Sequence, residues 1–163
     1  MTLRLSEHPG GVETADGPRI VYDVERDEAF FGAARVAGPA LVGEVAAGPG
    51  DWVVRCDRVD FPPGGVAYRH VHPGPGIRRL LRGELTIDRD GERRTYRAGE
   101  WWLEEANDAV LATASATEDT AFVRVLLLPA EWAGRRTIRY LDPTDEGRPK
   151  LQRATVLLEE PLR

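Results

Sequence analysis

The sequence predicts an all-β protein, a sandwich or barrel of short strands with little room for helices. Glycine and proline recur at short intervals, for example in Pro62-Pro63-Gly64-Gly65 and Pro73-Gly74-Pro75-Gly76. The segments between them are short and either apolar or alternating, which is typical of strands. Asp90-Gly91 separates two such segments and is a strong hairpin signal. These three observations together indicate antiparallel sheets.

The individual strands follow from these boundaries. Segments 51–59 and 121–128 are rich in valine and leucine, and segments 66–72 and 77–81 lie on either side of a Gly-Pro turn. Segments 84–89 and 94–97 flank the Asp-Gly pair, so 84–97 is expected to form one hairpin. Outside this centre the pattern weakens. We expect a short helix or strand in 29–42, a turn-rich connection at 142–149, and late strands at 137–140 and 154–158.

Length and composition favour one globular domain over residues 1–163. The chain is 42% apolar and 30% charged, with a formal net charge of -5. Because a negative protein does not attract a phosphate backbone, nucleic acid is not an expected partner. No apolar run approaches the roughly 18 residues that span a bilayer, so no membrane is expected either. A single cysteine excludes a disulfide scaffold and suggests a reducing, cytoplasmic location.

The stretch from Gly64 to Glu84 resembles the first motif of the cupin family. In that motif a glycine precedes a His-x-His pair by five residues, and a glutamate and a second glycine follow. Here Gly64, His70, His72 and Gly83 match this frame. The resemblance covers about residues 51–130, the expected barrel core. It implies a cupin double-stranded β-helix, the RmlC-like jelly-roll barrel, with flanking N- and C-terminal strands, and it implies a homodimer.

The second cupin motif is expected between Gly99 and Ala114, where only its first glycine is kept. Asn107 stands at its second glycine, which is tolerable because asparagine reaches left-handed backbone angles more easily than most residues. Trp101 and Trp102 precede this position on an expected strand. Since neighbours on a strand face opposite sides, one tryptophan should pack in the barrel and the other on an outer surface.

Metal binding is one hypothesis for the site. His70 and His72 lie two residues apart on a strand and present two imidazoles on one face. In cupins, the resemblance implies, the other ligands are a glutamate and a histidine, and these positions hold Gly76 (or Ile77) and Val110. Two histidines alone make a weak cation site. The cofactor is therefore either absent or a divalent transition metal.

A third metal ligand could come from Glu104 or Asp108, which lie in the second motif. Against a metal, Arg78 shares the parity of residue 76, so its permanent positive charge would point toward the same site. At an effective dielectric of 20, a divalent ion and a guanidinium ~6 Å apart repel by roughly 5 kcal/mol.

A metal-free pocket is the other hypothesis. Tyr68, His70 and His72 share a parity, and Arg78 would approach from the adjacent strand. Arginine binds a carboxylate with two parallel hydrogen bonds, and imidazole can shuttle a proton near neutral pH. We therefore expect a small organic, anionic ligand in the barrel, with acid/base catalysis left open. The alternatives are a metal-dependent oxygenase, isomerase or lyase, and a non-catalytic sensing or assembly module.

Overall fold

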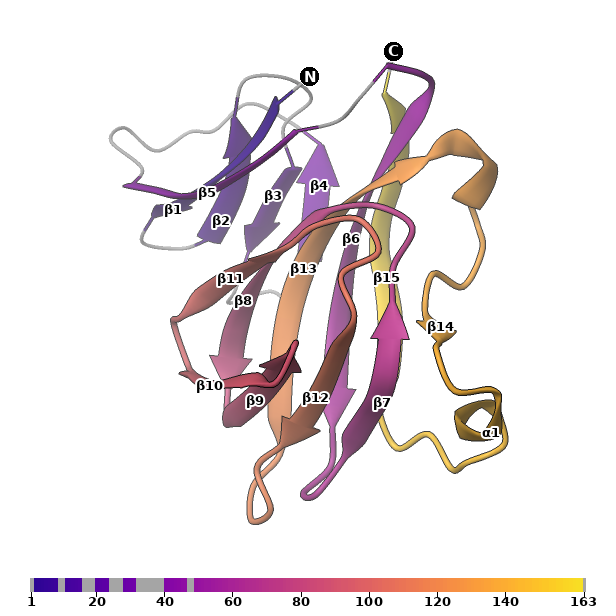
Figure 1. Ribbon diagram of the computed structural model, residues 1–163. Helices are drawn as coiled ribbons and strands as arrows, with labels where there is room; N and C mark the ends of the chain where they lie inside the picture. Colours follow the sequence, from indigo (N-terminus) through magenta and orange to yellow (C-terminus); the bar gives the residue numbers. More distant parts are fainter. Residues whose placement is uncertain are drawn as a thin grey trace.

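The computed structural model describes residues 2–8, 11–15, 20–23, 28–31, 40–46 and 49–162, with side chains from residue 49 to residue 161. These residues form three five-stranded antiparallel sheets (Figure 1). The described helices are a 3-10 turn, η1 (Ala130–Trp132), and the four-residue α1 (Pro143–Glu146). Neither is long and apolar enough to cross a membrane. The predicted all-β fold class is confirmed.

The first sheet comes from the N-terminal quarter of the chain and has the order β4-β3-β2-β1-β5. It contacts the barrel through β5, which lies against β8 and β11, and through β4, which lies against β15. The segment 29–42 was expected to hold a short helix or strand. Strands occupy both of its ends, and residues 32–39 lie outside the described residues. The strands are β1 (Thr2–His8), β2 (Gly11–Ala15), β3 (Ile20–Asp23), β4 (Glu28–Phe31) and β5 (Ala40–Ala46).

The other two sheets face each other and form the barrel (Figure 1). Their orders are β11-β8-β13-β6-β15 and β10-β9-β12-β7-β14. The first contains β6 (Trp52–Phe61), β8 (Gly76–Arg82), β11 (Trp101–Glu104), β13 (Thr120–Pro129) and β15 (Arg153–Leu162). The second contains β7 (Val66–Val71), β9 (Glu84–Arg89), β10 (Glu92–Arg97), β12 (Val110–Ala114) and β14 (Arg139–Tyr140).

The predicted strands agree closely with the observed ones. The six clearest predictions match β6, β7, β8, β9, β10 and β13 with ends that differ by at most two residues. The hairpin over 84–97 is present, and Asp90 and Gly91 both have positive φ, 52° and 84°. Those angles are the ones a two-residue type I′ turn requires. Asn107 has φ 63°, as its place in the second motif predicted.

The side chains of β6 alternate between the two faces of their sheet. Val54 and Cys56 point away from the barrel and pack with residues of β8 and β13. Asp57 and Val59 point into the barrel and line its cavity. Because both faces of this sheet are covered, its middle strand, β13, is buried over almost its whole length. The tryptophan pair follows the same rule: Trp102 is 3% exposed and Trp101 is 38% exposed.

Candidate functional site

A cavity of about 750 Å³ lies between the two barrel sheets. Its floor is apolar. Its middle carries a belt of buried polar side chains, namely Arg55, Asp57, His70, His72, Arg78, Glu104, Arg124 and Thr137. Its mouth is bounded by the C-terminal segment from Gly134 to Glu159. Apolar ligand pockets with a few converging polar groups commonly have 300–1,000 Å³, so the size suits a small organic molecule. The floor consists of Val59, Phe61, Ala67, Leu85, Ile87, Trp102, Val110, Ala112 and Phe122.

The polar belt begins with a row of side chains across one sheet. Arg78 on β8 lies opposite Arg124 on β13, and Arg124 lies opposite Asp57 on β6. Trp102 on β11 continues the row beyond Arg78. All four line the cavity. Directly opposed side chains on one face lie about 4.5–5.5 Å apart at Cβ, so this register holds two arginines side by side.

Each arginine of the row is paired with a buried carboxylate. Arg124 donates from Nε and Nη2 to Asp57 Oδ2 at 3.0 and 2.8 Å. Arg78 Nη2 lies 2.6 Å from Glu104 Oε2, and Trp102 Nε1 donates to Glu104 Oε1 at 2.8 Å. The Arg78 contact is an ion pair without good hydrogen-bond alignment. Asp57 Oδ1 is buried and has no hydrogen-bond partner among the described residues, which a water or a ligand could supply.

His72 is locked in one neutral tautomer. Arg124 Nη1 lies 3.1 Å from His72 Nε2, and since a guanidinium only donates, Nε2 must accept. The proton is therefore on Nδ1, which donates to Thr137 Oγ1 at 3.1 Å. Burial, followed by the charge of Arg124, holds the pKa of His72 well below its usual value. The lone pair on Nε2 of His72 is thus engaged in a hydrogen bond with Arg124, which is permanently charged.

His70 leaves one ring nitrogen for the cavity. Its Nδ1 lies 2.7 Å from the carbonyl oxygen of Tyr68 and donates to it. Within the described part of the chain, Nε2 has no hydrogen-bond partner, and it carries the lone pair of this tautomer. Burial lowers the pKa of His70 to about 4, although Glu104 acts in the opposite direction. His70 is therefore neutral at pH 7 and can accept a hydrogen bond.

Tyr68 does not share the face of the two histidines, which corrects the sequence prediction. The pairing of β7 with β12 shifts between Val110↔His70 and Ala112↔Ala67, so β7 contains one extra residue. Such a bulge breaks strict alternation. Ala67 and His70 both line the cavity, whereas Tyr68 does not. Its ring instead lies under Arg148 and Lys150.

Three residues of the belt were not among the predicted site residues. Arg124 and Asp57 belong to the row described above, and Arg55 donates to Glu159 beside them. The signal was present in the sequence, because an isolated arginine in the otherwise apolar run Ala121–Leu128 must be buried with a partner. Arg55 and Asp57 share the inward parity of β6.

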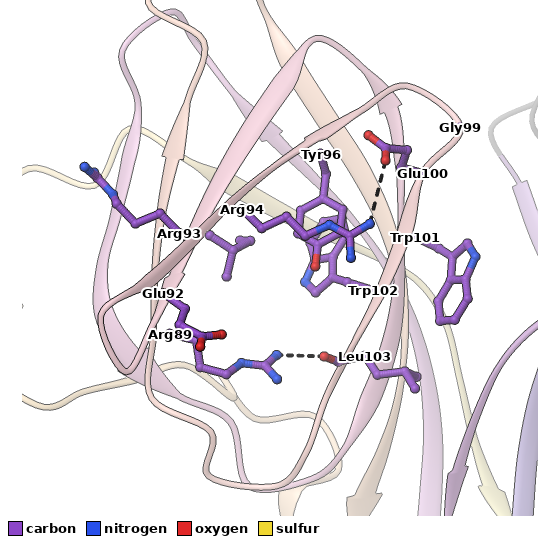
Figure 2. Close-up of a pocket in the computed structure, with 11 residues that line it drawn as sticks. Arg89, Glu92, Arg93, Arg94, Tyr96, Gly99, Glu100, Trp101, Trp102 and Leu103 are labelled. Carbon is purple, nitrogen blue, oxygen red and sulfur yellow. Dashed lines mark hydrogen bonds and ion pairs between the residues drawn. The ribbon is translucent and has the colours of Figure 1, made fainter.

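A second pocket of about 640 Å³ lies between the edges of β10 and β11. Trp102 and Ile87 line both this pocket and the barrel cavity, so they separate the two. Figure 2 shows Arg94 above the Tyr96 ring and directed toward Glu100, while Arg89 donates to the Leu103 carbonyl. None of the predicted site residues lines this pocket, and its ion pairs are exposed and weak.

Comparison with known proteins agrees with the architecture. Residues 57–124 match the cupin domain family, and the match includes both histidines and the row from Arg78 to Arg124. This chain contains a cupin domain. No curated protein matches the sequence.

Three solved structures illustrate the likeness of the cupin domain to others. The EutQ protein of Clostridium difficile is 18% identical, with TM-score 0.43, over 49% of this chain and 60% of its own length. A cupin-like protein from Thermotoga maritima is 20% identical, with TM-score 0.47, over 57% and 77%. An RmlC-like cupin from Shewanella frigidimarina is 12% identical, with TM-score 0.44, over 78% and 85%. The chain thus spans less than two thirds of the EutQ protein.

The residues of this cupin domain do not fit a divalent metal. The lone pair on Nε2 of His72 accepts a hydrogen bond from Arg124, and Glu104 is bound to Arg78 and Trp102. Asp108 lies outside the cavity, where it accepts from the Glu105 amide at 2.9 Å. From residue 49 to residue 161, no group of three His, Cys, Asp or Glu side chains is placed to hold an ion. The hypothesis of a third ligand at Glu104 or Asp108 has no geometric support.

Arg78 also fills the space of the glutamate that cupins use as a metal ligand. Gly76 stands at that position, and its carbonyl accepts from Arg78 Nη1 at 2.9 Å. A Cβ atom on Gly76 would lie 3.0 Å from the same Nη1, 2.8 Å from the Val125 carbonyl oxygen and 2.5 Å from Leu126. The inward Arg78 therefore depends on the absence of a side chain at residue 76.

We accordingly predict that the protein binds divalent transition metals at most weakly. Protein purified without a histidine tag should contain well under one metal ion per chain by elemental analysis. Zinc, manganese and nickel should leave its melting temperature unchanged after correction for nonspecific effects. A near-stoichiometric ion that disappears in His72→Gln would contradict this prediction.

Proposed function

We propose that the cupin barrel binds a small organic acid and holds its carboxylate by arginine side chains without a metal. The observation that carries the proposal is the in-register pair Arg78 and Arg124 on the inward face of the barrel. Like charges directly opposed on a sheet destabilise each other. An anion placed at this pair relieves that repulsion and accepts from the guanidinium N–H groups that the protein's own acceptors leave free.

The charge of the whole cavity supports an anionic ligand. Six basic and four acidic side chains line it, and the two neutral histidines add no charge. Within the described residues, Arg55, Arg78, Arg124 and Arg136 each have a carboxylate partner, whereas Arg135 and Lys150 at the mouth form no ion pair. The excess of positive charge therefore lies where a ligand would enter, which favours capture of an anion.

Binding is better supported than proton transfer. A general base works best when its pKa is near the operating pH. The pKa of His70 is lowered to about 4, so its Nε2 is a weak base but a good hydrogen-bond acceptor. A bound anion would raise this pKa, because an opposite charge favours the protonated imidazole. His70 would then become a stronger proton acceptor only with a ligand in place.

Titration calorimetry with carboxylates tests this proposal. We expect Arg124→Lys to weaken binding about tenfold, because lysine keeps the charge and loses the planar fork. Arg97→Lys is the matched control, since Arg97 is exposed and lies outside the cavity. Unchanged affinity in Arg124→Lys, or an equal loss in Arg97→Lys, would count against the arginine site.

A further inference from the structure

The floor of the cavity suggests the class of acid. Resting on the proposed function, we propose that the ligand is an aromatic carboxylic acid whose planar ring lies in a slot between an aromatic wall and the two alanines, Ala67 and Ala112, of the facing sheet. The carboxylate would lie at the arginine pair, and the ring would extend below it into the floor. The two walls come from the two facing sheets.

The aromatic wall is built on the sheet that also carries the arginines. Phe61, Trp102 and Phe122 project from β6, β11 and β13. The ring centroids of Phe61 and Phe122 are 6.2 Å apart, and those of Trp102 and Phe122 are 5.4 Å apart at 68°. Tyr96 stacks on Trp102 at 4.7 Å and supports it from the second pocket. Ring systems held in this way favour another aromatic ring in edge or offset contact.

The opposite wall, which also carries Leu85, Ile87 and Val110, contains two small side chains next to each other. Ala67 on β7 and Ala112 on β12 are register partners, and both line the cavity. The bulge in β7 turns Ala67 inward at the position where strict alternation from His70 would place Tyr68. A methyl group on each of these two strands leaves more space in front of the aromatic wall than a larger side chain would. A planar ring fits such a slot better than a puckered one.

The size of the cavity also requires more than a carboxylate. An acetate ion would leave most of the roughly 750 Å³ unfilled and the apolar floor in contact with water. A ring that covers the floor removes this apolar surface from water, which is the main source of affinity in pockets of this kind.

Calorimetry with three acids tests the inference. Benzoate should bind about 100-fold more tightly than acetate, as expected from burial of a phenyl ring. It should bind at least about threefold more tightly than cyclohexanecarboxylate, which has the same carbon count without planarity. If benzoate and acetate bind equally, or the puckered acid binds best, the aromatic slot is refuted and the carboxylate site stands. If no carboxylate binds, the proposed function itself is refuted.

Two variants locate the slot. Ala112→Leu should weaken benzoate at least tenfold by filling the space in front of the aromatic wall. Thr113→Leu is the matched control, because residue 113 lies on the same strand and does not line the cavity. Phe122→Leu keeps an apolar floor and should remove the preference for benzoate over cyclohexanecarboxylate. Folding of each variant is checked by its melting curve, and full benzoate affinity in folded Ala112→Leu would overturn the proposal.

Discussion

Asp57→Asn is expected to lower the free energy of unfolding by about 3–5 kcal/mol. The substitution keeps the shape of the side chain and removes its charge. Arg124 would then remain buried without a carboxylate and beside the second cation of the row, Arg78. An intact buried ion pair contributes little net stability, because the attraction between its charges is largely offset by the cost of removing both from water. The main loss in the variant is therefore the cost of keeping the unpaired charge of Arg124 away from water. Urea denaturation measures the change.

The matched control for Asp57→Asn is Glu84→Gln. Glu84 pairs with Arg97 at 2.9 Å, a distance close to that of Asp57 and Arg124, but both partners are exposed. Exposed pairs contribute about 0–1 kcal/mol.

Replacing both members of the buried pair, with Asp57→Leu and Arg124→Met together, should restore much of the stability that Asp57→Asn loses. Equal effects of Asp57→Asn and Glu84→Gln would contradict the buried-pair account.

The second large effect is a loss of stability in mild acid. The pKa of His70 is about 4 in the folded chain, against 6.5 for the unperturbed side chain. Between these values the unfolded chain binds the proton and the folded chain does not, so stability is complete above pH 6.5 and declines as the pH falls toward 4. The difference corresponds to about 3 kcal/mol. His72, whose pKa is also lowered, adds to the same trend.

His70→Gln separates this effect from the titration of carboxylates. The variant should lose less stability than the unmodified protein between pH 6.5 and pH 4, because glutamine does not titrate. Chemical denaturation at several pH values gives the two curves, and their difference isolates the contribution of His70. Parallel curves would show that His70 has an ordinary pKa.

The strands of the barrel could be predicted because local rules agree with the tertiary fold. Gly-Pro turns, the Asp90-Gly91 hairpin and the left-handed Asn107 are encoded by the residues at those positions. The bulge in β7 could not be predicted, since an extra residue on one strand depends on its partner β12. Tyr68 was therefore placed on the wrong face, whereas His70 and His72, which follow the bulge, both reached the cavity.

The chemistry of the belt was predicted in part. Arg78 lies in the cavity, as its parity indicated, but its carboxylate partner is Glu104, which the sequence suggested only as a metal ligand. Arg124 and Asp57 are 67 residues apart in the sequence, and only the register of β13 with β6 brings them together. Pairing partners of buried charges are thus a tertiary property that spacing along the chain does not encode.

The close approach at Gly76 also bears on how this cupin could change over generations. A glutamate at position 76 would collide with the β13 backbone and with the guanidinium of Arg78 before it could reach any ion. Removing Arg78 first would strand the negative charge of Glu104 in the interior. Since each single substitution is harmful on its own, a glutamate at position 76 would require Arg78 and Glu104 to change with it, and changes of specificity are expected in the floor and the mouth instead.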